Sequence, residues 1–533
     1  MENVIAVANI IKCPICGIET SKLNGHLRDY HQEKEIESAI IADKNKGFSD
    51  VEIGKKYGIT YRQLEKVIRK VVGVSLSVIK AEKKIKTLFP KDFKEEITTI
   101  WSFRGRGNWA THSGEYRGNW SPYIPRNVIL KYSEPGELVL DYFCGAGTTA
   151  VEAKLLGRRC VAFDINDKAI ELAKKNVDFE VPTKEMLLQK KYEPELFVGD
   201  ARDLSFLRNN SIDLICAHPP YANIIHYTEH DKGDLSYLDT EHFLKEIKKV
   251  AEESYRVLKP GRQCAILIGD MRRHRHVIPL GFELINVYLN AGFKLKELVI
   301  KRQHNCKTTG FWYANSIKFN FLLLAHEYLP IFEKPKPHAL LTIGEEMLDY
   351  GVVVPTLEKP SIKKRIDELE TTTVWILPEK DFEKHLNKNV IERYSKDGYS
   401  TITFSLSFEN KKHSLEHKEK KKKGLLFIKS PFLVNNISPS NIEFYLNEMK
   451  DIVNRNSLVI SKGGFIVIQT KDVRIDGYTE PLAKRIVDML TLDNLWLKEI
   501  VVITQEKQNS QVQSVDEHLN ITHQYLLVYE VKE

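Results

Sequence analysis

The sequence has no long apolar run, few cysteines and little excess charge of either sign. No stretch of roughly 18 or more apolar residues occurs, so no segment is predicted to cross a membrane. The first apolar stretch, Val4 to Ile11, follows Glu2 and leads directly to Cys13, which is not typical of a signal peptide. Seven cysteines in 533 residues do not suit the disulfide framework of a secreted protein. We therefore expect a protein of a reducing, intracellular compartment.

The rest of the composition is that of an ordinary globular chain. Hydrophobic residues make up 42% and charged residues 28%, which supplies enough apolar material for a sizeable core. A chain of 533 residues is expected to form several structural units, since a typical domain has about 150. The 79 basic and 72 acidic side chains give a net charge of +7. This mild excess permits a polyanionic partner without demonstrating one.

Two cysteines and two histidines near the amino terminus have the spacing of metal ligands. Two residues separate Cys13 from Cys16, and four separate His26 from His31. Sulfur and imidazole ligands of this kind suit tetrahedral zinc, although the segment between the two pairs is shorter than in the usual two-Cys, two-His finger. A redox cysteine pair or unpaired surface residues are the alternatives, and a redox pair leaves the histidines unexplained. We predict a structural zinc finger in residues 1–35, because so short a module can hardly fold without its metal.

Residues 36–85 are predicted to form a helical module. Ser49 and Thr60 are typical helix caps, and Gly58 stands at the break between two helical patterns. The module resembles a bacterial helix-turn-helix, and the resemblance implies that the second helix faces a DNA major groove. The side chains offered there would be those of Thr60, Tyr61, Arg62, Gln63 and Lys66. An ordinary helical hairpin with a solvated charged face is the alternative.

Aromatic and basic residues alternate between Phe89 and Pro135, in a stretch that reads as a loop. They include Trp101, Arg104, Arg106, Trp109, Arg117 and Trp120. Such side chains can stack on bases and hold phosphate, and they can equally pack against the rim of the domain that follows. The sequence does not decide between these two interpretations.

From Leu138 to Glu333, apolar strand-like runs alternate with helical patterns, which predicts a parallel α/β sheet. The first strand ends in the glycine-rich turn of residues 139–149, Val-Leu-Asp-Tyr-Phe-Cys-Gly-Ala-Gly-Thr-Thr, a type of turn that brings backbone close to a ligand. The second strand ends at Asp164, at about the spacing at which a carboxylate reaches a ribose. The third ends at Asp200, and the fourth leads into His218-Pro-Pro-Tyr221.

This ordered set of motifs resembles the S-adenosylmethionine-dependent methyltransferases that modify the exocyclic amino groups of adenine or cytosine in DNA. The resemblance covers roughly residues 101–333 and implies a Rossmann-like methyltransferase sheet in a catalytic domain of residues 86–334. The cofactor-binding residues that it implies are Asp141, Phe143, Gly145, Gly147, Thr148, Asp164, Asp200 and Ala201. The catalytic residues that it implies are His218, Pro219, Pro220 and Tyr221. The segment 119–125 lies where the family often places a motif that flanks the cofactor.

The resemblance also implies a mechanism. The first side chain of the catalytic motif and the Pro219 carbonyl would accept hydrogen bonds from the target amine, and Tyr221 would stack on a base flipped out of the duplex. His218 departs from the family, which commonly has Asp, Asn or Ser at this position. A neutral imidazole can still accept a hydrogen bond, whereas imidazolium cannot. Activity is therefore expected to fall as the pH drops through the pKa of His218.

The second half of the chain contains a weak repeat of the first. With a shift of 202 positions, Gly261 falls on Gly463 and Asp270 on Asp472, and the match extends to residues 296–297 and 498–499. Residues 217–223 similarly align with 429–435, but Phe432 and Leu433 replace the second proline and the tyrosine. We predict a connector over 335–373 and a degenerate methyltransferase-like lobe over 374–533 that binds no cofactor. Chance similarity of two generic α/β halves is the alternative.

Together these patterns predict a site-specific DNA amino-methyltransferase with structural zinc, acting with companion restriction or defence proteins. A cytoplasmic, nucleoid-associated location in a prokaryotic cell would follow. An RNA (tRNA) base methyltransferase is the nearest rival, since similar motifs occur there. A DNA-binding regulator with an inactive methyltransferase fold is the third hypothesis.

Overall fold

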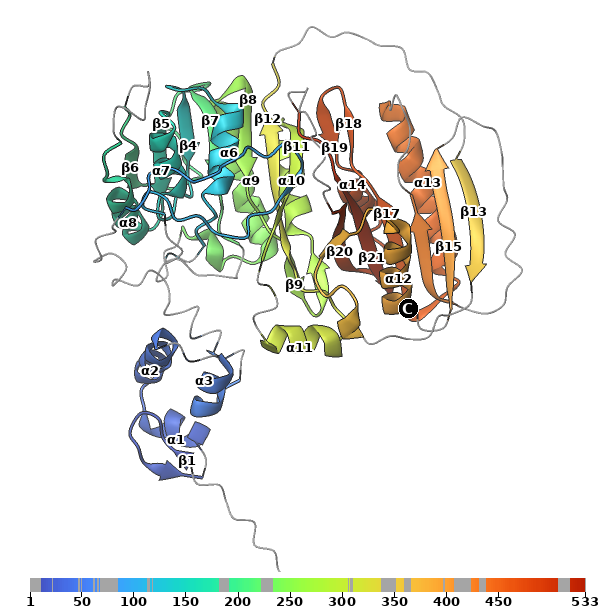
Figure 1. The fold of residues 1–533 in the computed structure, drawn as a ribbon, viewed down its shortest axis with the longest axis horizontal. Coiled ribbons are helices and arrows are strands. Elements are labelled where there is room, and N and C mark those ends of the chain that lie inside the picture. Colours follow the sequence, from blue (N-terminus) through green and yellow to red (C-terminus); the bar gives the residue numbers. More distant parts are fainter. Residues whose placement is uncertain are drawn as a thin grey trace, which may run out of the picture.

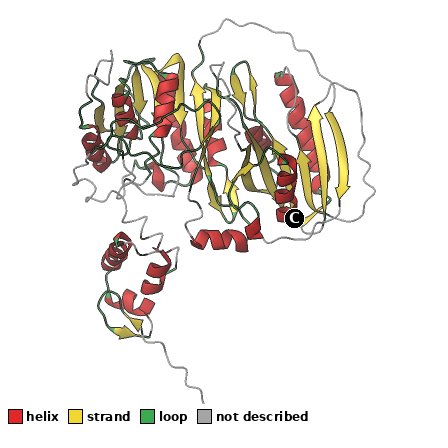
Figure 2. Ribbon diagram, in the orientation of Figure 1, coloured by secondary structure: helices red, strands yellow, loops and turns green. Residues whose placement is uncertain are grey.

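The computed structural model of the chain describes residues 11–21, 23–46, 48, 50–60, 63–64, 67, 85–112, 116, 118–181, 191–221, 233–304, 306, 310–336, 351–358, 366–395, 398–406, 423–430, 438–506 and 518–532. An amino-terminal module is followed by two lobes, each built on its own β-sheet (Figures 1 and 2). Within these described residues, none of the helices combines the length and apolar character that crossing a membrane requires.

The amino-terminal module is a single small unit. Its elements are β1 (Ile11–Lys12), β2 (Glu19–Thr20), α1 (Leu23–Tyr30), α2 (Glu33–Asn45) and α3 (Asp50–Tyr57). Cys13 and Leu27 from the predicted finger share one hydrophobic core with Ile40, Ile53 and Leu64 from the predicted helical module. The boundary expected between residues 35 and 36 therefore does not separate two cores.

The first lobe is a mixed sheet in the strand order β3-β11-β12-β8-β7-β4-β5-β6. Its strands are β3 (Ile100–Trp101), β4 (Leu138–Asp141), β5 (Arg159–Asp164), β6 (Glu195–Val198), β7 (Ile212–Ala217), β8 (Leu258–Ile266), β11 (Lys294–Arg302) and β12 (His326–Glu333). The run from β8 to β6 is parallel, and β12 is antiparallel to both of its neighbours. The parallel α/β sheet predicted from the sequence is therefore confirmed, with one antiparallel strand inserted.

Helices cover both faces of this sheet. They are α6 (Tyr123–Tyr132), α7 (Thr148–Leu155), α8 (Asp167–Val177), α9 (Thr240–Val257) and α10 (Leu280–Asn290). The lobe also contains α11 (Gly310–Lys318), a short 3-10 turn, η1 (Leu235–Tyr237), and a hairpin of β9 (Met271–Arg273) and β10 (His276–Ile278). The cores place α6, α7 and α8 on one face and α9 and α10 on the other. Side chains of Asn166 and Asp239 cap α8 and α9, so the polar residues before each apolar stripe fix where these helices begin.

The second lobe is a sheet in the order β13-β15-β16-β17-β21-β20-β14. Its elements are β13 (Gly351–Glu358), η2 (Ile366–Glu368), β14 (Val374–Leu377), α12 (Phe382–Tyr394), β15 (Tyr399–Leu406), β16 (Lys423–Lys429), α13 (Pro439–Ser457), β17 (Ile460–Thr470), β18 (Val473–Ile475), β19 (Tyr478–Glu480), α14 (Leu482–Met489), β20 (Leu495–Gln505) and β21 (His523–Val531). Part of the second sheet lies within residues 335–373, the range predicted as a connector. Strand β13 lies inside that range and pairs antiparallel with β15, so it belongs to the second sheet.

The two lobes repeat the same order of elements over the segment that the sequence shift identified. β8, the β9–β10 hairpin, α10, β11 and β12 correspond in order and pairing to β17, the β18–β19 hairpin, α14, β20 and β21. Gly261 and Gly463 both take a positive φ, of 79° and 71°. Asp270 accepts a hydrogen bond from the Gly281 amide at 3.0 Å, and Asp472 accepts one from the Ala483 amide at 3.2 Å.

Among its described residues, the second lobe lacks the helix–strand–helix–strand unit that contributes to the cavity of the first. In the first lobe, α7, β5, α8 and β6 lie between β4 and β7. The corresponding strands β15 and β16 are separated only by residues 407–422, too few for a helix–strand–helix–strand unit. In the first lobe, β4 pairs with the parallel strand β5. In the second lobe, the equivalent strand β15 pairs at this position with β13, which is antiparallel to it.

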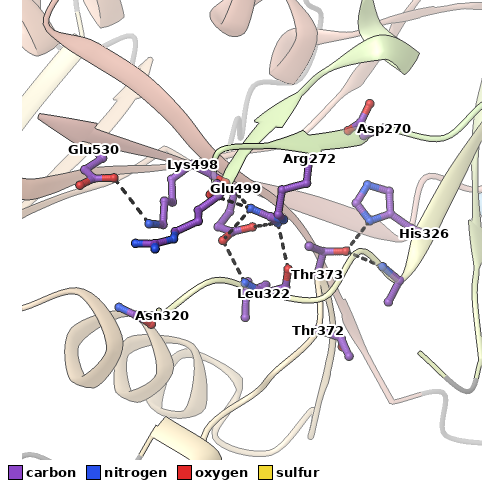
Figure 3. A network of polar contacts seen from close by, with 12 residues as sticks. Asp270, Arg272, Asn320, Leu322, His326, Thr372, Thr373, Lys498, Glu499 and Glu530 are labelled. Carbon is purple, nitrogen blue, oxygen red and sulfur yellow. Dashed lines mark hydrogen bonds and ion pairs between the residues drawn. The ribbon is translucent and has the colours of Figure 1, made fainter. Parts of the chain in front are cut away.

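The lobes meet through two reciprocal ion pairs. Arg272 of the first lobe donates to the buried Glu499 of the second, and Arg474 of the second donates to the buried Glu297 of the first at 2.6 Å. Each glutamate also accepts a backbone N–H from the opposite lobe, Glu499 that of Leu322 at 3.0 Å and Glu297 that of Leu519 at 3.1 Å. Figure 3 shows the first of these clusters. Each lobe contributes one arginine and one glutamate to the contact, as each subunit does in an isologous interface.

Candidate active site

A cavity opens at the carboxyl ends of β4, β5 and β7 in the first lobe. Its lining is formed by Tyr116, Gly118, Asn119, Trp120, Tyr142, Phe143, Cys144, Gly145, Asp164, Ile165, Gly199, Asp200, Ala201, His218, Pro220, Gly233, Asp234 and Leu235. The sequence had predicted Phe143, Gly145, Asp164, Asp200, Ala201, His218 and Pro220 as site residues, and the fold brings these together. Asp141, Gly147, Thr148, Pro219 and Tyr221 lie outside this lining.

The glycine turn is shaped by two carboxylates, one behind it and one beside it. Asp141 accepts the Phe143 amide at 3.0 Å from inside the core, and burial raises its pKa to about 7. Asp164 accepts the Gly145 amide at 2.9 Å. Gly147 takes a φ of +82° directly before α7, and a Cβ there would lie 3.0 Å from Ala173 Cβ. Asp141 and Gly147 therefore set the shape of the turn, whereas Phe143 and Gly145 form its surface in the cavity.

Three carboxylates and no Lys or Arg side chain stand among the described residues that line the cavity. Burial raises the pKa of Asp164 to about 6. Asp200 is held by Arg202, whose Nη2 lies 2.5 Å from its carboxylate, and Asp234 caps the short turn η1. This charge pattern suits a ligand with cationic groups and does not suit a phosphate-bearing nucleotide.

His218 stands at the mouth of the cavity, directly after β7. Its ring stacks on Trp120, with ring centres 5.6 Å apart and planes at 22°. The pKa of His218 is lowered to about 4, mainly by desolvation and also by the positive charges of Lys301 and Arg106, against the opposing effect of Glu327. At neutral pH the ring is therefore uncharged and retains a nitrogen lone pair.

Behind His218 lies a polar chain that the sequence did not reveal. His218 Nε2 is 3.3 Å from the Tyr221 hydroxyl, which donates to Glu327 at 2.6 Å. Lys301 donates to the other oxygen of Glu327 at 2.7 Å. Burial alone would raise the pKa of Glu327, but Lys301 lowers it to about 2. The only sequence signal was opposite charges on facing strands, since Lys301 and Glu327 are register partners in β11 and β12.

The aromatic-basic segment packs against the first lobe. Trp101, Trp109 and Trp120 are all buried. The carboxylate of Glu152 on α7, itself fully buried, accepts hydrogen bonds from the Trp109 ring nitrogen at 2.6 Å and from Arg126 at 2.9 Å. The packing interpretation is thus favoured over base stacking for these three tryptophans.

Asp234 and Leu235 also line the cavity but were not predicted from the sequence, because no recognisable motif precedes them.

The four predicted metal ligands come together in the amino-terminal module. One ligand atom each from Cys13, Cys16, His26 and His31 lies within 4.8 Å of the others. Cys13 Sγ is 3.5 Å from His31 Nε2, and Cys16 Sγ is 3.2 Å from His26 Nε2. His31 Nδ1 contacts Glu35 at 3.1 Å, the kind of carboxylate contact that orients a metal-bound imidazole.

The predicted metal can be tested with cobalt. We expect the protein to bind one Co²⁺ at this cluster and to develop the visible absorption of a tetrahedral thiolate site. Cys13→Ser should remove that absorption and lower the stability of residues 11–64 alone, because Cys13 also belongs to their core. Cys306→Ser, at a cysteine outside the module, is the control. An unchanged cobalt spectrum in Cys13→Ser would contradict the metal site.

The predicted DNA-reading helix is described only at its start. Thr60 and Gln63 form reciprocal hydrogen bonds, Thr60 N to Gln63 Oε1 at 2.9 Å and Gln63 N to Thr60 Oγ1 at 3.3 Å, which is the pattern of a capping box. Tyr61, Arg62 and Lys66 lie outside the described residues. The helix-turn-helix remains a prediction.

The fold and the cavity define a Rossmann-like methyltransferase. A general methyltransferase-domain model matches residues 133–285. The family model described as DNA methylase, of the N6/N4 methyltransferase type, matches residues 26–175 and 212–426, well over half of the chain. The protein therefore belongs to this DNA methylase family.

Individual relatives match over shorter stretches. A tRNA (guanine(10)-N2)-dimethyltransferase of Methanothermobacter thermautotrophicus is 32% identical over 131 residues, 24% of this chain and 35% of the relative. The type II methyltransferase M.MthZI of the same organism is 26% identical over 170 residues, 29% of this chain and 48% of the relative. A solved SAM-dependent methyltransferase of Methanosarcina mazei is 18% identical, with a TM-score of 0.26, over 39% of this chain and 97% of that one. The chain thus spans half or less of the length of these two curated relatives.

Proposed function

We propose that the protein transfers a methyl group from S-adenosylmethionine to an exocyclic amino group of adenine or cytosine in DNA. The observation that carries the proposal is the cavity itself, in which the glycine turn, Asp164, His218 and Pro220 converge. Membership of the DNA methylase family supports DNA as the substrate.

The residues of the cavity suit this cofactor. S-adenosylmethionine supplies a methyl group activated by a sulfonium charge, and it carries an amino group but no phosphate. Asp164 and Asp200 offer carboxylates to ribose hydroxyls and to the adenine amine, respectively. Phe143, Ile165 and Ala201 offer apolar surface to the adenine ring. The absence of Lys and Arg from the described lining fits a cationic ligand.

The catalytic segment would act by orienting the target amine. Its lone pair is conjugated into the base, so the amine must be held in line with the methyl group, and most of the rate gain would come from this placement. The Pro219 carbonyl and the neutral His218 ring are the acceptors offered to its N–H bonds. The Tyr221 hydroxyl donates to Glu327 at 2.6 Å, which would hold the ring in place to stack on a base flipped out of the duplex.

The test is direct methyl transfer. Purified protein given S-adenosylmethionine with a labelled methyl group is expected to label double-stranded DNA, and nucleoside analysis would assign N6-methyladenine or N4-methylcytosine. Sequencing of the modified DNA would give the recognition site. Label in transfer RNA and none in DNA would favour the rival RNA methyltransferase, which the tRNA-modifying relative suggests.

Gly145→Arg is the matched loss-of-binding variant. A Cβ at Gly145 would lie 3.1 Å from the Tyr116 ring, and its φ is +50°, so an arginine would distort the turn and fill the cavity. We expect cofactor binding by calorimetry to be abolished while the far-ultraviolet circular dichroism stays that of the parent. Retained binding in Gly145→Arg would refute the assigned cavity. A parent that binds no cofactor would favour a DNA-binding regulator with an inactive fold.

The amino-terminal module and the second lobe are proposed to serve target binding. Zinc would stabilise the shared core of the module, and the helix that begins at Thr60 would approach the DNA. Companion restriction or defence proteins and nucleoid association would follow from this role.

A further inference from the structure

A buried ion pair lies one hydroxyl group away from the ring that faces the target amine. Glu327 and Lys301 are joined at 2.7 Å, and both are largely shielded from solvent, with 8% and 19% of their side chains exposed. The Tyr221 hydroxyl links Glu327 to His218. A buried pair of this kind adds little net stability, because removing two charges from water costs about as much as their attraction returns.

The hydrogen bonds of this chain determine which ring nitrogen of His218 keeps its lone pair. Tyr221 gives its only proton to Glu327, so towards His218 its oxygen is an acceptor. The neutral ring therefore carries its N–H on Nε2, which faces the Tyr221 hydroxyl, and Nδ1 keeps the lone pair. A proton taken up on Nδ1 would give an imidazolium whose Nε2–H still donates to Tyr221.

The second lobe retains the framework of this region but not the charges. His326 and Tyr328 flank Glu327 on β12, and His523 and Tyr525 occupy the same places on β21, with equivalent hydrogen bonds of 3.0 and 2.9 Å. In the second lobe, however, the residue between them is Gln524, and its register partner is Ile503 where the first lobe has Lys301. The lobe without a cofactor turn thus folds without the ion pair, so the pair is not required by the sheet.

We propose that His218 accepts the proton that the target amine loses on methylation, and that Glu327, held by Lys301 and acting through Tyr221, is its positioning residue. This proposal rests on the proposed function. The amine nitrogen forms a bond to the methyl carbon, the sulfur–carbon electron pair stays with sulfur, and an N–H proton moves to His218. The site begins with a sulfonium charge and ends with an imidazolium charge, which Glu327 then stabilises across the Tyr221 hydroxyl.

The charges near His218 favour proton transfer to its ring only once the methyl group is leaving the sulfonium. Before transfer, the low pKa of His218 keeps the ring neutral, and a neighbouring sulfonium would lower it further. After transfer that positive charge is gone, and the methylated arylammonium is a far stronger acid than imidazolium. The groups around the ring act in opposite senses, since Glu327 on β12 favours the proton while Lys301 on β11 and Arg106 in the preceding loop disfavour it.

The test uses two variants that are expected to shift the pKa of His218 in opposite directions. Glu327→Gln removes the negative charge, so the pKa of His218 should fall and the single-turnover rate should drop by about 10- to 100-fold, with cofactor affinity unchanged. Lys301→Gln leaves Glu327 uncompensated, so the pKa of His218 and the acid limb of the rate profile should move to higher pH. Glu327→Gln is expected to fold, because the second lobe carries Gln524 at the equivalent position.

The control is a cluster of the same composition elsewhere on β12. Glu333 accepts hydrogen bonds from Tyr478 at 2.7 Å and Lys296 at 2.7 Å, at the lobe interface rather than the cavity. Glu333→Gln should leave the rate and its pH profile as in the parent. Equal rates for Glu327→Gln and the parent, or an acid limb that moves the same way in both charge variants, would overturn the proposal.

A second readout does not depend on activity. Nuclear magnetic resonance titration of the His218 ring in the cofactor-free protein should give a lower pKa in Glu327→Gln and a higher one in Lys301→Gln than in the parent. One pKa shared by all three proteins would overturn the coupling between His218 and Glu327. If the parent transfers no methyl group to any nucleic acid, the proposed function fails, and the titration still decides this coupling.

Discussion

Replacing Glu499 by alanine is expected to lower the free energy of unfolding by about 3–5 kcal/mol. Its carboxylate is fully buried and accepts hydrogen bonds from Arg272 and from the Leu322 amide (Figure 3). Without it, a guanidinium with 12% of its surface exposed and a buried N–H group both lose their acceptor. The loss should be visible as a lower midpoint in chemical denaturation.

The structure offers two comparisons for this variant. Glu297→Ala removes the equivalent carboxylate on the other side of the interface and should cost a similar amount, because Arg474 and Leu519 then lose their acceptor. Glu443→Ala breaks an exposed ion pair with Arg485 and should cost less than about 1 kcal/mol. A loss below about 1 kcal/mol in Glu499→Ala would show that the interface does not depend on these pairs.

Replacing His218 by alanine is expected to slow the methyl-transfer step by a factor on the order of 10² to 10⁴, with cofactor affinity intact. The alanine removes the acceptor for the amine and leaves the cofactor-binding side chains in place. His218→Asn keeps a hydrogen-bond acceptor but cannot take up the proton, so its rate should lie between those of the parent and His218→Ala. A rate in His218→Ala equal to that of the parent would mean that the Pro219 carbonyl suffices.

The pH dependence of His218 follows from its lowered pKa. A free histidine would lose its lone pair near pH 6.5, but this ring stays neutral until the pH falls to about 4. Activity should therefore be insensitive to this group above pH 5 or so and fall towards pH 4, and in His218→Asn this acid limb should be absent. The same shift destabilises the fold in acid. Below about pH 6.5, His218 binds a proton in the unfolded chain, but in the folded chain it binds one only when the pH falls to about 4.

The cavity could be predicted from the sequence because its residues follow the ends of parallel strands in order. Strand ends meet at one edge of the sheet, so Asp164, Asp200 and His218 had to lie close together. The different roles of the two carboxylates at the glycine turn could not be predicted. Asp141 and Asp164 are both strand-end acids, and only the packing of α7 and β4 shows that Asp141 supports the turn from behind.

Contacts between distant segments were the least predictable part. Glu327 lies in β12, which is the last strand of the first sheet along the sequence, more than a hundred residues after Tyr221. A single charged residue in an apolar strand forms no recognisable motif. Two further repeats were missed because insertions change their offset. Thr98–Trp101 corresponds to Thr372–Trp375, with equivalent indole-to-carbonyl hydrogen bonds of 3.0 and 2.9 Å. Asn127 of α6 corresponds to Asn389 of α12, each accepting a backbone amide.

The reciprocal interface has a consequence for how the protein behaves on dilution. Two separate subunits joined by such a contact would part when their concentration fell below the dissociation constant. Here both halves belong to one chain, so the local concentration of each half around the other stays fixed, whatever the number of molecules in the cell. With assembly secured by covalent connection, the contact between the halves does not depend on a ligand pocket in the second half, and the cavity described in the first half stands on a twofold scaffold.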